Sequence, residues 1–166
     1  FKVGASGVTD DFGDRYYRGA RPNGIYIPRF RNVDAKSKRK DYLSGFGYQG
    51  SASRTDWSRG IAELNRFGST LKAELIAPGP WQFGIGSWGE CLPYHENQMT
   101  LDRTKRDQWG QPIVNFDCSW KANELAMRKD MQASAVEMLE ASGLKNVKGF
   151  DDVVNSAPGN CIHEMG

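Results

Sequence analysis

The chain has 166 residues, with 22 Lys and Arg against 20 Asp and Glu, so its formal net charge at pH 7 is only +2. This balance gives no general reason to expect nucleic acid as a partner, and no apolar run approaches the roughly 20 residues that cross a bilayer. Hydrophobic residues make up 39% of the chain, a composition typical of a globular domain and not of a disordered segment. The length suits one domain with a core of its own.

Three widely spaced cysteines, Cys91, Cys118 and Cys161, contain no C-x-x-C pair. Their number and spacing argue against a disulfide framework and against a structural zinc site, and two histidines are too few for a histidine-rich metal centre. We therefore predict no metal site, and the cysteines leave the cellular compartment open.

The first half of the chain contains few periodic apolar positions. Residues 24–28 predict a short strand closed by Pro28, and the cationic run 36–40 is typical of a solvated loop. Apolar residues from Ile61 to Leu75 recur at helical spacing, with Gly68 expected to break or kink that helix.

The second half predicts strands followed by a long helix. The residues of 81–94 and 99–102 predict extended strands, and those of 107–112 are typical of a turn. Residues 114–120 alternate between apolar and polar positions, which predicts another strand. A helix is expected from about residue 122 to 142, with Gly143 as its C-terminal cap. Its expected apolar face comprises Leu125, Met131, Ala135, Met138 and Leu139. Antiparallel strands with segregated helices predict an α+β fold.

Two stretches match G-x-G-x-x-G, at residues 45–50 and 84–89. This fingerprint holds a nucleotide only where a strand precedes it and a helix N-terminus follows, because the helix end binds the pyrophosphate. Ser51 to Arg54 follow the first stretch and Pro93 comes soon after the second. Neither opens a helix, so we interpret both as glycine-spaced strand or loop segments.

The aromatic and acidic residues suggest two further interpretations. Five tryptophans could form a sugar-stacking platform, although Trp81 and Trp120 also suit the core of their strands. A glycosidase needs two carboxylates about 5 to 10 Å apart across a cleft, and linear spacing selects no such pair. The carboxylates considered are Glu90, Glu96, Asp102 and Asp107.

The two histidines differ in context. His95 lies in a predicted hairpin turn at residues 93–97, where a solvated side chain is expected. His163 follows a Pro158-Gly159-Asn160 turn, and a histidine there could accept a proton from a substrate hydroxyl.

The last 75 residues carry an ordered set of motifs. Pro93, Asn97, Met99 and Leu101, followed by Asp107, Gly110 and Pro112, resemble the P-x-x-x-N-x-V-x-L…D-x-x-G-x-P pattern of the glucose–methanol–choline (GMC) oxidoreductase family. Asn123-Glu124 and Gly143 stand where that family begins and ends its following helix, and His163-Glu164-Met165-Gly166 resembles the opening of its H-x-x-G-T-x-x-M motif. This ending and the GFGYQG and PGPW segments resemble the branch of bacterial sugar and polyol dehydrogenases.

The resemblance implies that residues 1–166 are a single substrate-binding domain of a larger FAD-dependent oxidoreductase acting on CH–OH groups. It implies an antiparallel sheet flanked by helices that covers a flavin held by a separate FAD-binding domain, and His163 as the catalytic base that takes the alcohol proton. The FAD-binding half, the Thr-x-x-Met continuation and the later Asn or His partner are absent from this sequence. We therefore expect this chain alone to bind no FAD tightly and to turn nothing over.

The expected partners are a sugar or polyol substrate and the FAD domain of the same parent chain. The substrate-binding residues are expected at the end of the 81–94 strand, where Trp88, Glu90 and Tyr94 would share one face if no bulge intervenes. The alternative function is a non-catalytic carbohydrate-binding module that uses the tryptophans.

Overall fold

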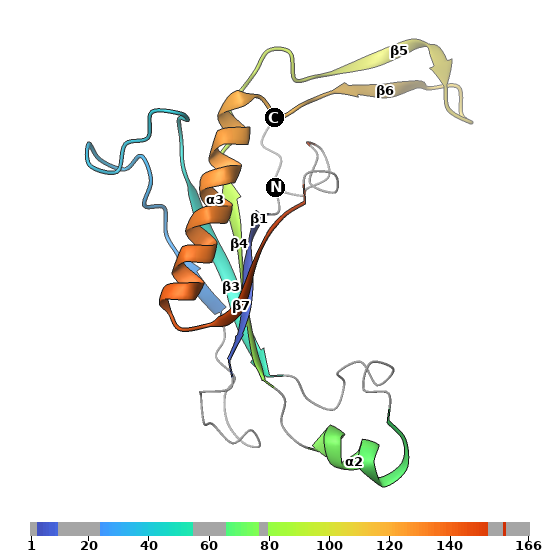
Figure 1. Ribbon diagram of the computed structural model, residues 1–166. Helices are drawn as coiled ribbons and strands as arrows, with labels where there is room; N and C mark the ends of the chain where they lie inside the picture. Colours follow the sequence, from blue (N-terminus) through green and yellow to red (C-terminus); the bar gives the residue numbers. More distant parts are fainter. Residues whose placement is uncertain (1–2, 10–23, 55–65, 77–79, 153–157, 159–166) are drawn as a thin grey trace.

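The computed structural model describes residues 3–9, 24–54, 66–76, 80–152 and 158. The described part of the chain contains strands that pair antiparallel throughout, together with two helices, which confirms the α+β prediction at that level (Figure 1). The elements are β1 (Val3–Thr9), β2 (Gly24–Ile27), β3 (Phe46–Arg54), α2 (Gly68–Ile76), β4 (Trp81–Gly89), β5 (Gln98–Arg106), β6 (Pro112–Asp117), α3 (Ala122–Ala141) and β7 (Lys145–Asp151).

Five of the strands form one sheet in the order β2-β3-β4-β1-β7. β3 and β4 pair along their whole length, from Phe46 opposite Gly89 to Arg54 opposite Trp81. β1, the first described strand, lies inside the sheet, between β4 and β7, the last described strand. Residues distant in sequence thus build the centre of the sheet.

Helix α3 covers one face of this sheet (Figure 1). Met127, Met131, Ala135 and Leu139 recur every four residues and are at most 6% exposed, so they form one apolar stripe. Val3 and Ala5 of β1, Phe46 and Tyr48 of β3, and Ile85 of β4 contribute to the same core. The sheet presents these residues to α3 because alternate strand positions share a face.

The sequence locates α3 correctly and its apolar face in part. Its N-terminus is closed by Glu124, whose Oε2 accepts the Lys121 N–H at 3.1 Å, and its C-terminus by Gly143, whose φ of +85° is a glycine conformation. Leu125, expected on the buried face, is 44% exposed. The buried face of α3 instead includes Met127 and three polar side chains, those of Glu124, Arg128 and Ser134.

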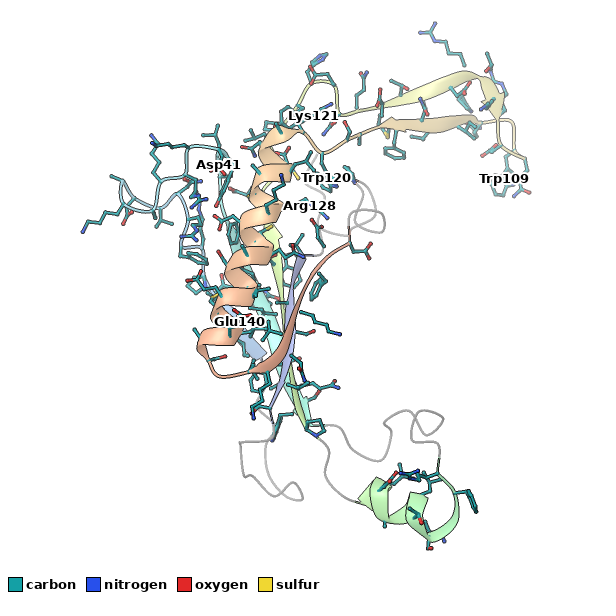
Figure 2. The ribbon with its side chains drawn as sticks, viewed as in Figure 1. Asp41, Trp109, Trp120, Lys121, Arg128 and Glu140 are labelled. Carbon is teal, nitrogen blue, oxygen red and sulfur yellow. The ribbon has the colours of Figure 1, made fainter. Side chains whose placement is uncertain are left out.

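Strands β5 and β6 form a two-stranded arm that projects away from the sheet (Figure 1). At its base Asn97 Nδ2 donates to Ser119 O at 3.3 Å, and Ser119 N donates to Asn97 Oδ1 at 3.1 Å. Trp109 lies at the far end of the arm (Figure 2). The turn predicted at residues 107–112 is confirmed: Asp107 N donates to Gln111 O at 2.9 Å.

Several boundaries differ from the sequence predictions. Only β2 was expected in the first 50 residues, whereas β1 also forms and β3 begins there, because glycine- and serine-rich strands lack the β-branched pattern that marks a strand. The strand expected over 114–120 ends at Asp117. The helix break expected at Gly68 is confirmed, because residues 66 and 67 lie outside the helix and α2 begins at Gly68. No described helix is long and apolar enough to cross a membrane.

Candidate functional site

The face of the sheet opposite α3 is the candidate site, and we call it the open face. One row of side-chain positions crosses all five strands, and a second row lies two residues further along. The first row is Tyr26, Gln49, Gly86, Gly4 and Phe150, and the second is Gly24, Ser51, Gly84, Ser6 and Lys148. Most of these side chains are exposed, and the centre of the face consists of glycine and serine.

Two aromatic rings lie close to glycines of the open face. A Cβ placed on Gly86 would lie 3.8 Å from the Trp88 ring, and a Cβ on Gly4 would lie 2.9 Å from the Phe150 ring. Gly4 and Gly86 pair directly across β1 and β4. The two rings therefore converge on one glycine pair and give the face an aromatic floor, with Trp88 44% exposed.

Gly84 is a position of the open face where an added side chain would meet no neighbouring atom. A Cβ built there meets no heavy atom within 4 Å, so the packing of the described residues does not require glycine. Glycine in a strand interior costs roughly 0.5–1 kcal/mol relative to alanine, and it often marks a place where a ligand or another backbone approaches closely.

An ion pair borders the open face next to Trp88. Arg29 follows β2 and its Nη1 lies 3.4 Å from Glu90 Oε2. The guanidinium passes over Gly45, where any Cβ would lie 2.4 Å from Arg29 Nε. Glu90 and Trp88 stand two residues apart and so share this side of the sheet, because Glu90 N continues the ladder by donating to Gly45 O.

The structure brings two of the three predicted substrate residues together. Trp88 and Glu90 are neighbours on the open face, whereas Tyr94 lies beyond the end of β4 and beside the first turn of α3. Desolvation and the neighbouring Glu124 carboxylate raise the pKa of Tyr94. Tyr94 does not share the face of Trp88 and Glu90 as predicted, because β4 ends at Gly89 and the strand pairing extends only one residue further, to Glu90. His163 lies outside the described residues.

The remaining sequence candidates have structural roles. Both glycine fingerprints fall on strands β3 and β4, as interpreted from the sequence, so neither precedes a helix N-terminus. Asp102 accepts N–H groups of Thr104 and Lys105, which lower its pKa, and Asp107 accepts those of Trp109 and Gln111.

The tryptophans form no common platform among the described residues. Trp81 is core, only 8% exposed, and Trp120 is half-buried, so of the two predicted core residues Trp81 is confirmed. Trp109 is 75% exposed at the tip of the arm, far along β5 and β6 from the open face (Figure 2). His95 is exposed, as expected. The hairpin predicted at residues 93–97 is wrong, because the strands on either side, β4 and β5, belong to different sheets and do not pair.

Sequence reasoning missed Arg29 and Phe150. Gly45 is consistent with the position of Arg29, because a glycine leaves room for a long side chain to cross the strand. The sequence alone does not show that Arg29 is the side chain that crosses there. Phe150 was hidden because β7 has a single aromatic residue among polar ones and no clear alternation.

A buried polar cluster lies on the other side of the sheet, against α3. Asp130 is 9% exposed and accepts hydrogen bonds from Tyr42 Oη at 2.6 Å, Arg31 Nε at 3.1 Å and Ser134 Oγ at 2.9 Å. Its carboxylate joins the 28–45 loop to the helix, so we assign it a structural role. Within the described ranges, no group of His, Cys, Asp and Glu is arranged to hold a metal ion.

Comparisons with protein-family models, with curated proteins and with solved structures find no match to this chain.

Proposed function

We propose that this chain is the substrate-binding part of an FAD-dependent oxidoreductase that acts on CH–OH groups of sugars or polyols. The observation that carries the proposal is the open face, where bare backbone at Gly84 adjoins an aromatic floor of Trp88 and Phe150. A planar ring can approach such a face closely, and exposed aromatic residues suit the apolar side of a sugar. The ordered motifs between Pro93 and His163, which resemble those of GMC oxidoreductases, add the reaction class.

The described residues fit only one part of FAD. They contain no strand–glycine loop–helix unit to hold a pyrophosphate, since both fingerprints lie in strands. The open face suits a planar ring. We therefore propose that a separate domain holds the dinucleotide and that this chain covers the ring, which when bound would supply the hydride acceptor.

In this proposal His163 is the base. An imidazole titrates near neutral pH, so its neutral form can take the hydroxyl proton of an alcohol at physiological pH. Removing that proton favours the developing carbonyl and weakens the adjacent C–H bond.

The test uses the parent protein, purified with whatever flavin it carries. We expect the visible flavin band to bleach when a sugar or polyol is added without oxygen, and the His163→Ala protein to bleach roughly 10²- to 10⁴-fold more slowly. His95→Ala is the matched control and should bleach at the unaltered rate, because His95 lies exposed in a turn. A protein without flavin, or an unchanged bleaching rate in His163→Ala, would contradict the proposal.

A non-catalytic carbohydrate-binding module is the second candidate, and the exposed Trp88 ring supports it. A colourless protein that still binds sugars would favour this function over the oxidoreductase.

A further inference from the structure

We propose that the corner formed by Trp88 and the Arg29–Glu90 ion pair binds one ring of a neutral cyclic sugar or polyol and selects against sugar acids. This inference rests on the proposed function and deepens it by naming the charge class of the substrate and a specificity residue, Arg29.

The Arg29 guanidinium is held in place before any ligand arrives. Its Nε donates to Arg31 O at 3.1 Å, its Nη2 to Asn32 O at 3.0 Å, and its Nη1 to Glu90 Oε2 at 3.4 Å. Gly45 leaves the space through which the side chain crosses β3. An immobilised guanidinium loses little conformational entropy on binding, which favours recognition.

The ion pair retains groups that a ligand can use. A guanidinium has five N–H donors, and three of them serve the contacts above, which leaves one on each terminal nitrogen without a hydrogen-bond acceptor among the described residues. The side chains of Arg29 and Glu90 are 40% and 65% exposed. Donors beside a carboxylate acceptor match two neighbouring hydroxyl groups of a sugar, each of which both donates and accepts.

The adjacent indole supplies the apolar part of the site. The edge of the Trp88 ring lies next to Gly86, and 44% of the residue remains exposed to solvent. A pyranose ring stacked on it would bring its rim hydroxyls toward Glu90, two residues further along the chain. The corner thus combines a stacking surface with fixed polar groups, as small-molecule sites do.

The charge of the corner determines its preference. Glu90 neutralises Arg29, so the pair attracts a neutral polyol through hydrogen bonds but offers no net charge to a carboxylate. A sugar acid would also place its carboxylate near that of Glu90. Changing Glu90 to glutamine keeps the size of the side chain but leaves the guanidinium positive, which should favour an acidic sugar.

The experiment is a ligand-observed NMR titration of the protein with glucose and with glucuronate, which share a ring and differ by a carboxylate. We expect glucose to bind more tightly than glucuronate, and Glu90→Gln to shift the ratio of the two affinities toward glucuronate by roughly tenfold. Arg29→Met and Trp88→Ala should each weaken glucose binding several-fold, whereas Trp109→Ala should not. Circular dichroism confirms that each variant is folded.

The outcomes separate this inference from the proposed function. The proposed sugar site is wrong if Glu90→Gln leaves the ratio of the two affinities unaltered, or if Trp88→Ala leaves glucose binding unchanged. Either result contradicts this site even if the flavin of the parent protein bleaches with sugar. Failure of the unaltered protein to bind glucose at all overturns it as well. Sugar binding with the expected ratio change in a flavin-free parent supports the corner and contradicts only the oxidoreductase.

Discussion

Replacing Asp130 with alanine is expected to lower the free energy of unfolding by about 1–3 kcal/mol, the cost of leaving partly buried hydrogen-bond donors without their acceptor. Asp130 is 9% exposed and accepts hydrogen bonds from Arg31, Tyr42 and Ser134. Without it, a partly buried guanidinium and a buried phenol lose their acceptor, and the 28–45 loop loses its main connection to α3.

Denaturant unfolding at pH 7 measures this loss. Glu140→Ala is the matched control, an exposed acidic residue near the C-terminal end of the same helix (Figure 2), and its effect should stay within about 0.5 kcal/mol. Equal effects of the two substitutions would show that the Asp130 cluster contributes nothing specific.

The contribution of Asp130 to the free energy of unfolding should also depend on pH. Burial opposes ionisation of this carboxyl, but hydrogen bonds from Tyr42, Ser134 and Arg31 outweigh burial and hold its pKa below the usual value. A lowered pKa in the folded state contributes stability above the unfolded pKa of about 4, and that stability is lost as the pH falls through the folded pKa. The difference between the unaltered chain and Asp130→Ala should therefore shrink as the pH falls below about 4; a difference that stays constant down to pH 2 would contradict this assignment.

Two glycines one strand apart should respond in opposite ways to alanine. A Cβ on Gly50 would lie 2.1 Å from Gly84 O and 2.9 Å from Ile85 Cα. Both are backbone atoms, so no side-chain rotation relieves the clash and β3 and β4 must separate locally. We expect Gly50→Ala to destabilise the chain by about 3 kcal/mol, at the upper end of the cost of overpacking.

Gly84→Ala is the control for this pair, since a Cβ there meets nothing within 4 Å. Its stability should equal that of the unaltered chain or exceed it by roughly 0.5–1 kcal/mol, because alanine costs less entropy than glycine in a strand. Thermal unfolding followed by circular dichroism compares the two variants. Destabilisation by Gly84→Ala as large as that by Gly50→Ala would indicate that the open face is covered within this chain.

The elements that could be predicted from sequence are those that carry their signal locally. Helix α3 shows an apolar repeat and a terminal glycine, and β2 is closed by Pro28, so both follow from short stretches of chain. Strands β1 and β3 carry glycine and serine because their partners approach closely, which is a property of the assembled sheet. For the same reason Trp88 and Glu90 could be proposed from alternation, whereas Arg29 and Phe150 required the register of other strands.

The position of β1 inside the sheet has a consequence for synthesis on the ribosome. β1 is translated before the other described strands, yet one of its edges pairs with β4 and the other with β7, the last described strand. Its second edge therefore stays unpaired until β7 has been translated, about 140 residues later, and an unpaired edge can bind other strands. Pairings between such distant residues also form slowly, since a long loop must close first. Completion of the sheet is thus a late event, and the nascent chain is most prone to aggregation just before β7 becomes available.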